Sequence, residues 1–397
     1  MYSRVLAGEL RAAAKRMPVV TLTGPRQSGK TFLARATFPN HAYVSLEDPD
    51  ERSRAATDPR GFLSRFTRES VILDEVQRSP DLLSYLQGMV DADARPGRFV
   101  LTGSQNLLLM HGVSQTLAGR TALLHLLPLS LSELLGRPPL VPADLHHAPK
   151  GRLSVPAASL WPTIWAGFYP RIHDQKLPPQ SWLADYRRTY VERDLRDILR
   201  VTDLPAFDAF LCLAAARTGQ ELNLSDLAAD AGITQPTARA WLHALEIAFL
   251  VTVIRPHHKS FRKRLRKRPR LHFLDTGLVC HLLGIQSPEM LERHPLRGAI
   301  FESYVAAELT KAFVHRGREA PLFFWRDSTG HEVDILMDLG DRLVPVEVKS
   351  GQTVAADATD NLIWWTNLAR SHGGLVVYGG TTAHSLHGIS IRPWFIA

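Results

Sequence analysis

Two glycines five positions apart, followed by a lysine and a threonine, constrain this chain more than any other feature. The segment GPRQSGKT begins at Gly24 and ends at Thr31, directly after the apolar run Val19–Thr23. Glycine permits a tight turn and a close approach of the backbone to a ligand. The exposed N–H groups of such a turn, together with the positive end of a following helix, bind anions. The pattern therefore predicts a strand, a phosphate-binding loop and a helix.

Side chains in the same segment extend this prediction to a nucleotide. A lysine at this position reaches the β- and γ-phosphates, and the hydroxyl that follows it binds Mg²⁺. These roles fall to Lys30 and Thr31. A glycine-rich turn without a ligand is the alternative. The residues expected to contact the nucleotide are Gly24, Pro25, Arg26, Gln27, Ser28, Gly29, Lys30 and Thr31.

A pair of acids supplies the second half of this site. The apolar run Val71–Asp74 ends in an aspartate, and Glu75 follows it. Because open α/β sheets bind ligands at the carboxyl ends of their strands, we expect both carboxylates near the phosphates. Asp74 would hold the magnesium ion indirectly, and Glu75 would polarise the attacking water. Adjacent acids are common in proteins, so this interpretation depends on their position after the glycine loop.

Two further positions are candidates for sensing the γ-phosphate. Phe99–Asn106 reads as another buried strand that ends in polar residues, so Ser104 or Gln105 would face the nucleotide. In sheets of the additional-strand type, this strand lies between the other two. Arg120 could act as an arginine finger or sensor, with a surface arginine as the alternative. The catalytic residues predicted for ATP hydrolysis are Lys30, Glu75, Ser104 and Arg120.

Short apolar runs alternate with helical or loop-like segments in residues 1–135. Such alternation predicts an α/β domain with a parallel sheet and helices on both faces. A Pro-rich stretch at 136–156 then begins a linker with connecting helices, which we assign to 136–200. Within it, 181–200 reads as one amphipathic helix. The apolar runs are Val19–Thr23, Ala42–Leu46, Val71–Asp74, Phe99–Thr102 and Ala122–Leu126.

Residues 201–290 contain a helix-turn-helix pattern. Within Leu222–Leu250, Gly232 breaks one helical segment and Thr234 can cap the next. Two helices joined by such a turn commonly place the second helix in a DNA groove. The residues expected to begin this second helix and contact DNA are Gln235, Thr237 and Arg239.

A strongly basic segment follows this pattern. Eight of the twelve residues from Lys259 to Arg270 are Lys or Arg, which equals the net charge of +8 of the whole chain. Flanking strands would place the segment on a wing, so 201–290 reads as a winged-helix domain whose DNA binding depends on salt. A helical bundle with a solvated basic loop is the alternative. The wing residues predicted to contact DNA are Arg262, Lys263, Arg264, Arg266, Lys267 and Arg268.

Charged side chains interrupt two apolar strands within 291–397. Asp334 lies inside one strand, and Glu347 and Lys349 alternate with valines on the next, so both face the same side. Burial of these charges is costly unless they form a site. Two carboxylates can hold a divalent cation, and the lysine can orient water for attack on a phosphate. Glu302, on the preceding helix, could be a further ligand.

This arrangement is similar to the PD-(D/E)xK nuclease pattern, and it predicts a restriction-endonuclease-like α/β fold for 291–397. Asp334, Glu347 and Lys349 would be catalytic. Glu302, Asp334 and Glu347 would bind Mg²⁺ or Mn²⁺. Because a fold can persist without its chemistry, an inactive or purely DNA-docking domain is the alternative.

Motifs along the whole chain resemble a widespread family of prokaryotic AAA+-type ATP-binding proteins. These proteins carry a C-terminal domain of unknown function 4143. The resemblance implies a P-loop AAA+-type parallel-sheet domain, a winged-helix segment and a nuclease-like C-terminal fold. The chain departs from the family pattern in its Pro-rich stretch at 136–156 and in its basic segment at 259–270. The motifs are GPRQSGKT, ILDEVQ, LTGSQ, LAGR, YVERDL, FLDTGL, FES, EVD and VEVKSG.

We therefore expect a Mg²⁺-dependent P-loop ATPase that binds ATP and DNA. ATP turnover would control DNA remodelling or metal-dependent DNA cleavage. The alternative is a nucleotide-switched regulatory protein that binds DNA or protein and contains an inactive nuclease-like domain. Both branched DNA and single-stranded DNA are candidate partners. Arg120 could act in a neighbouring copy only within a homo-oligomer.

Composition agrees with a cytoplasmic protein that has no membrane partner. No uninterrupted apolar run reaches the roughly 18 residues that a membrane helix needs. The two cysteines, Cys212 and Cys280, have no spacing typical of metal ligands and do not form a disulfide framework.

Overall fold

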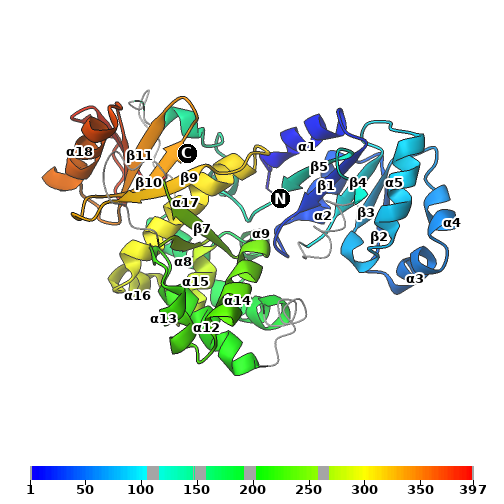
Figure 1. Cartoon of the computed structure of the whole chain (residues 1–397), viewed down its shortest axis with the longest axis horizontal. Coiled ribbons are helices and arrows are strands. Elements are labelled where there is room, and N and C mark those ends of the chain that lie inside the picture. The colour runs from blue at the N-terminus through cyan, green and yellow to red at the C-terminus, as the bar shows by residue number, and fades with distance from the viewer. Residues whose placement is uncertain are drawn as a thin grey trace. The chain divides into compact units, whose positions relative to one another are not determined.

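The computed structural model describes residues 2–104, 116–145, 147, 158–191, 203–257 and 268–395. The chain divides into two compact units (Figure 1). The first unit consists of Met1–Leu129, Ile247–Phe249 and Val314–Arg318. The second unit consists of Ser130–Glu246, Leu250–Phe313 and Glu319–Ala397.

In the described part of the first unit, five strands form a parallel sheet. Their order is β2-β3-β4-β1-β5, and each neighbouring pair is parallel. This confirms the predicted α/β domain, with β4 between β3 and β1. The strands are β1 (Val19–Thr23), β2 (Ala42–Ser45), β3 (Val71–Asp74), β4 (Phe99–Thr102) and β5 (Thr121–His125). The helices are α1 (Leu6–Ala14), α2 (Lys30–Thr37), α3 (Pro49–Thr57), α4 (Pro59–Ser64), η1 (Val76–Arg78) and α5 (Leu82–Ala92).

Apolar residues of this sheet pack into two cores on opposite faces. Val19 packs with residues of α3, α4 and α5, whereas its neighbour Val20 packs with α1 and α2. Because successive strand residues point to opposite faces, a strand covered on both sides needs apolar residues throughout. All residues of β1 are buried. The carboxyl ends of the strands are then the edge at which a ligand can bind.

A nine-stranded sheet runs through the described part of the second unit, in the order β13-β14-β12-β11-β10-β9-β7-β8-β6. The strands are β6 (Gln220–Glu221), β7 (Val251–Pro256), β8 (Arg270–Phe273), β9 (Leu322–Arg326), β10 (Glu332–Asp338), β11 (Leu343–Lys349), β12 (Leu375–Tyr378), β13 (His384–Leu386) and β14 (Ile389–Pro393). The helices are α7 (Leu131–Leu135), η2 (Pro142–Asp144), α8 (Leu160–Ala166), α9 (Pro170–Asp174), α10 (Pro179–Tyr186), η3 (Arg187–Val191), α12 (Leu204–Ala216), α13 (Leu224–Asp230), α14 (Gln235–Ile247), α15 (Thr276–Leu282), α16 (Pro288–Arg293), α17 (Arg297–Val314), η4 (Ala356–Thr359) and α18 (Asp360–Ala369).

One strand pair joins two parts of this sheet that the sequence assigns to different domains. Arg255 in β7 pairs in parallel with Phe323 in β9, which makes the sheet continuous from the helix-turn-helix region into the C-terminal region. The second unit accordingly includes most of the segments 136–200, 201–290 and 291–397. Residues Ile247–Phe249 and Val314–Arg318, where α14 and α17 end, belong to the first unit.

Aromatic side chains fill the interior of the second unit. Trp161, Phe168 and Tyr169 are buried. The helix predicted at 181–200 begins at Pro179 as α10 and continues from Arg187 to Val191 as a π-helical segment, whereas residues 192–200 lie outside the described ranges. The wider turn of a π-helix changes which side chains share a face, and sequence periodicity does not reveal it.

Several predicted functional residues lie outside the described ranges. These residues are Gln105, Arg262, Lys263, Arg264, Arg266 and Lys267.

Among the helices that the structure describes, none combines the length and apolar character needed to cross a membrane.

Candidate functional site

The glycine loop between β1 and α2 has a backbone that only glycine adopts without strain. Gly24 has a φ of +149°, and a Cβ atom placed there would lie 2.2 Å from the carbonyl oxygen of Leu126. Gly29 has a φ of +94° and stands at the start of α2. Both glycines that the motif requires therefore have a conformational reason to be glycine.

The Lys30 side chain lies folded across this loop. Its Nζ donates hydrogen bonds to the carbonyl oxygens of Gly24, at 3.0 Å, and Pro25, at 2.9 Å. Burial lowers the pKa of Lys30 to about 8, although the charges of Glu75 and Asp74 act in the opposite direction. A phosphate in the loop would replace the two carbonyl contacts with a full negative charge. Lys30 therefore has both the position and the electrostatic reason to bind a phosphate.

Asp74 ends β3 directly beside the first turn of α2. The Thr31 hydroxyl donates to its two carboxylate oxygens at 3.0 and 2.9 Å, and the Thr102 hydroxyl also donates to it. Tyr43 donates from its hydroxyl to Oδ2 of Asp74 at 2.9 Å, and burial together with this carboxylate raises the pKa of Tyr43 to about 12. Hard oxygen ligands suit Mg²⁺, so the Thr31 hydroxyl and the Asp74 carboxylate fit a magnesium site.

The second acid, Glu75, is linked to the predicted γ-phosphate sensor through a residue that sequence reasoning missed. Gln77 donates from its side-chain amide to the Glu75 carboxylate and, at 2.9 Å, to the Ser104 hydroxyl. Glu75 has a φ of +56°, which is uncommon for a residue other than glycine. The three side chains connect the ends of β3 and β4. The ILDEVQ motif contained Gln77, but only the fold reveals its contact with Ser104.

Arg4, near the N-terminus, holds the glycine loop through hydrogen bonds to backbone oxygens. Arg4 is buried and donates to the carbonyl oxygens of Ser28, at 2.8 Å, and Leu127, at 2.6 Å. It thereby connects the glycine loop to the chain that follows β5. Nothing in the local sequence distinguishes Arg4 from a surface arginine, since the carbonyl oxygens of Ser28, Leu127 and Pro128 lie far along the chain and leave no side-chain pattern.

Arg120 lies at the wrong edge of the sheet to sense phosphates in its own first unit. Its backbone oxygen accepts from the N–H of Val19, at the amino end of β1, whereas the glycine loop follows the carboxyl end. The length of β1 separates the two edges by about 13 Å. The Arg120 side chain pairs with Asp91 at 2.5 Å. A finger role in a neighbouring copy stays a prediction.

The predicted nuclease-like residues come together in the second unit, although not as the pattern suggests. Asp334 in β10 accepts from the backbone N–H of Val348 in β11 at 2.9 Å. Lys349 forms an ion pair with Glu347 at 2.7 Å. Glu302 in α17 forms an ion pair with Arg270 at 3.0 Å. Arg270 was not among the predicted site residues.

The acids of this cluster repel one another. Burial raises the pKa of Glu302 well above its usual value, and the charges of Asp334 and Glu347 add to the shift. Burial and the charge of Asp334 likewise raise the pKa of Glu347 to about 7. His272 is fully buried, with Nε2 4.0 Å from Oε1 of Glu302, and burial lowers its pKa to about 3. The imidazole is therefore neutral and adds no positive charge to the cluster.

This cluster does not fit the divalent metal that the nuclease pattern implies. Among the described residues, no group of three His, Cys, Asp or Glu side chains is placed to hold a metal ion. The Arg270 guanidinium contacts Glu302 and Glu332 and lies 3.6 Å from Oδ1 of Asp334. A protein cation thus stands among the carboxylates.

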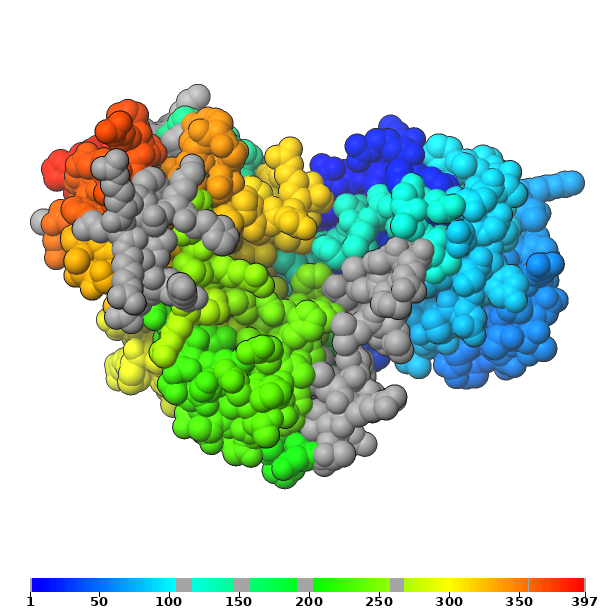
Figure 2. Space-filling view, viewed as in Figure 1, coloured from blue at the N-terminus to red at the C-terminus, as the bar shows by residue number. Residues whose placement is uncertain are grey.

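The helix-turn-helix segment has the expected local geometry. Gly232 has a φ of +67°, and the Thr234 hydroxyl accepts from the N–H of Thr237 at 3.3 Å at the start of α14. Gln235 and Arg239 are exposed, whereas Thr237 is half-buried. The helices α12, α13 and α14 gather in the region coloured green in Figure 2. Gln235 and Arg239 therefore lie on the exposed side of α14.

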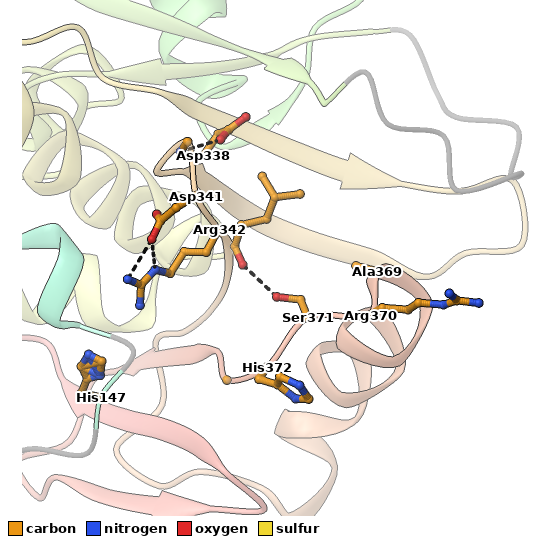
Figure 3. A pocket seen from close by; sticks show the side chains of 11 residues that line it. His147, Asp338, Asp341, Arg342, Ala369, Arg370, Ser371 and His372 are labelled. Carbon is orange, nitrogen blue, oxygen red and sulfur yellow. Dashed lines mark hydrogen bonds and ion pairs between the residues drawn. The ribbon is translucent and has the colours of Figure 1, made fainter.

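A cavity of about 700 Å³ lies elsewhere in the second unit, between the β10–β11 turn and the end of α18. Figure 3 shows Arg342 turned toward Asp341, with Arg370 extending outward. The Ser371 hydroxyl donates to the carbonyl oxygen of Leu343. None of the carboxylate-cluster residues lines this cavity, so it is separate from that cluster.

Comparison with known proteins places the chain in a family. Uncharacterized proteins of Mycobacterium tuberculosis and Mycobacterium bovis are each 32% identical over 354 residues, which cover 88% of this chain and 74% of the relative. Family models match an AAA domain at 16–135, a domain of unknown function (DUF8612) at 158–289 and another (DUF4143) at 297–395. The chain belongs to this AAA-domain family.

Membership of the AAA-domain family assigns a P-loop ATPase-like fold to the first unit, as the motifs predict. The match to the AAA domain includes the glycine loop and both acids, and the DUF4143 match includes Glu302, Asp334 and Glu347. Arg4 precedes the matched segment, and Arg270 lies within the DUF8612 match. A Walker-type ATPase of Pyrococcus abyssi is 14% identical, with a TM-score of 0.42 over 70% of this chain and 94% of that chain.

Proposed function

We propose that the protein hydrolyses ATP with Mg²⁺ at the glycine loop. The observation that carries this proposal is the contact of the Thr31 hydroxyl with Asp74, at 2.9 Å, beside a buried Lys30. Mg²⁺ would supply charge neutralisation between the β- and γ-phosphates. Lys30 would bind the phosphates, and Thr31 and Asp74 would hold the metal ion. Glu75, oriented by Gln77, would orient and polarise water.

Steady-state ATP turnover with Mg²⁺ tests this proposal, in the presence and absence of DNA. We expect Lys30→Ala to abolish turnover while the fold is retained. Lys15→Ala removes an exposed lysine at the end of α1 and serves as the matched control. A wild-type protein that hydrolyses nothing under either condition would contradict the proposal, as would a Lys30→Ala variant with normal turnover.

We further propose that the second unit binds DNA through α14. Three helices followed by an antiparallel strand pair agree with a winged-helix arrangement, and α14 would be the recognition helix. Its exposed Gln235 and Arg239 support this role, as does the concentration of basic residues between Lys259 and Arg270. ATP turnover would then control DNA remodelling.

Fluorescence anisotropy with labelled duplex, branched and single-stranded DNA tests this binding. If Arg239 contacts a phosphate, Arg239→Ala should lower affinity and reduce the slope of log K against log salt by about 1. Arg293→Ala removes an exposed arginine of α16 in the same unit and is the control. Equal affinities for wild type and Arg239→Ala on every DNA form would remove α14 from the proposal.

Metal-dependent DNA cleavage and a regulatory role without cleavage are the two candidates for the nuclease-like region. Arg270 among the carboxylates favours the regulatory candidate, since it satisfies charges that a metal ion would otherwise balance. Incubation of DNA with Mg²⁺ or Mn²⁺ separates the two. Cutting that disappears in Asp334→Ala would support a nuclease, and salt-sensitive binding without cutting would support the regulatory protein.

A further inference from the structure

We infer that Arg270, and not a divalent metal ion, is the cation that holds the carboxylate cluster of the second unit together. The acids of the cluster that lie next to Arg270 are Glu302 from α17 and Glu332 and Asp334 from β10. The inference deepens the regulatory candidate above and rests on it. According to this inference, the carboxylates at the nuclease-like positions stabilise the contact between the helix-turn-helix part of the unit and its C-terminal part.

Contacts from several sides fix the Arg270 guanidinium. Nη1 lies 3.0 Å from Oε1 of Glu302 and 3.6 Å from Oδ1 of Asp334, and Nη2 forms an ion pair with Glu332. The guanidinium carbon lies 5.0 Å from the centre of the Phe324 ring, which it covers. The side chain is only 5% exposed. A planar fork of donors matches several carboxylates at once, as a lysine could not.

Charges of alternating sign continue from this arginine across the sheet. Arg326 in β9 lies between Glu332, at 3.2 Å, and Glu221 of β6, at 2.9 Å. The Glu221 backbone in turn pairs with that of Arg270 in the β6–β8 ladder. Strands from both parts of the unit therefore share one ion-pair network, in addition to the backbone pairing of β7 with β9.

The guanidinium and a metal ion compete for the same oxygens. Mg²⁺ binds carboxylate oxygens at about 2.0–2.1 Å and requires near-octahedral space. Arg270 already contacts the carboxylates of Glu302 and Glu332 and lies close to Asp334. On the other side, Lys349 holds Glu347. A divalent ion here would have to displace a buried arginine that is itself held by two carboxylates and a ring face.

Mn²⁺ binding to the nucleotide-free, full-length protein tests this inference, with free Mn²⁺ measured by electron paramagnetic resonance. We expect the same Mn²⁺ binding for wild type and Asp334→Asn up to about 1 mM. If wild type bound one Mn²⁺ at least tenfold more tightly than Asp334→Asn, the inference would be wrong. Because neither ATP nor DNA is present, failure here is distinct from failure of the ATPase or DNA-binding proposals.

A double-mutant cycle on thermal unfolding is the second test. Arg270→Gln should lower the melting temperature of the second unit by roughly 10 °C, since it leaves several buried carboxylates without their cation. Glu302→Gln should lower it by less, since Arg270 keeps its ion pair with Glu332. The double variant should lose less than the sum of the two shifts, and EDTA should change none of them. Additive shifts, or a wild type that EDTA destabilises, would overturn the inference.

Less disruptive variants keep the inference testable if Arg270→Gln or Glu302→Gln fails to fold. Arg270→Lys keeps the charge but loses the fork, so its shift should couple with that of Glu332→Gln in the same manner. Arg293→Gln, which removes an exposed arginine of α16, is the matched control and should show additive behaviour with Glu302→Gln. Coupling as large for Arg293 as for Arg270 would also contradict a specific role for the buried arginine.

Discussion

Replacement of Arg4 by Gln tests how the glycine loop is held in shape. The wild-type guanidinium donates short hydrogen bonds to the carbonyl oxygens of Ser28 and Leu127, and its side chain is buried. A hydrogen bond from a charged donor contributes about 1.5–3 kcal/mol, so loss of both should cost about 3 kcal/mol or more. For a unit of this size, that corresponds to a fall in melting temperature of roughly 10 °C.

The same variant should bind ATP more weakly, since the released loop must be ordered again by the nucleotide. If ordering the loop again takes about 1.4 kcal/mol of the free energy of ATP binding, the dissociation constant for ATP rises tenfold. Calorimetry of the first unit's unfolding and titration with a fluorescent ATP analogue measure the two effects. Arg16→Gln, which removes an exposed arginine of the same N-terminal segment, is the control. Arg4→Gln with wild-type stability and affinity would refute this reasoning.

Three further outcomes follow from the geometry of the nucleotide site. Tyr43→Phe removes a half-exposed hydrogen bond to Asp74 and should cost about 1 kcal/mol, seen as a few-fold rise in the Mg²⁺ concentration that half-saturates ATP turnover; an unchanged Mg²⁺ dependence would exclude this role. Gly24→Ala places a Cβ atom 2.2 Å from the Leu126 carbonyl oxygen and should destabilise the first unit by about 2 kcal/mol or more in chemical unfolding, with loss of ATP binding; normal binding would show that the loop moves freely. The pKa of Lys30 is about 8, below its usual 10.5, so the free protein loses this charge as pH rises through 8, and ATP affinity should fall by up to tenfold per pH unit above it in a titration series; the same slope in Lys30→Arg, whose guanidinium stays charged, would assign the effect elsewhere.

Lys30 also changes the stability of the free protein with pH, in a direction opposite to that of ATP affinity. Its pKa in the folded state lies below the unfolded value, so the unfolded chain binds more protons between about pH 8 and pH 10.5. This group alone therefore raises stability as pH increases through that range. Bound phosphates would stabilise the charged lysine and remove the effect.

The nucleotide site could be predicted from sequence because its parts are local. The glycine loop, Lys30 and Thr31 are contiguous, and the apolar run before Asp74 fixes the sheet edge at which the carboxylate emerges. The five strands of the first unit match the predicted apolar runs to within a residue at each end. Parallel topology then brings Asp74 to the loop without further information.

The roles of residues whose partners lie far along the chain could not be predicted from the sequence. Arg4 contacts backbone oxygens, which leave no side-chain pattern to detect. Arg270 was hidden in the basic segment, where the charge density suggested solvent and phosphate, but the alternation of strand β8 turns this one arginine inward onto Glu302. For Arg120, the motif does not reveal which edge of the sheet the residue occupies, and its role in a neighbouring copy stays a prediction.

Calorimetric titration of ATP into the nucleotide-free protein, with and without Mg²⁺, tests the central claim most directly. The claim is that Lys30, Thr31 and Asp74 together bind a triphosphate and its metal ion. We predict one ATP bound per chain, tighter with Mg²⁺ than without it, and loss of binding in Lys30→Ala. Absence of heat at millimolar ATP, or equal binding by wild type and Lys30→Ala, would contradict the claim.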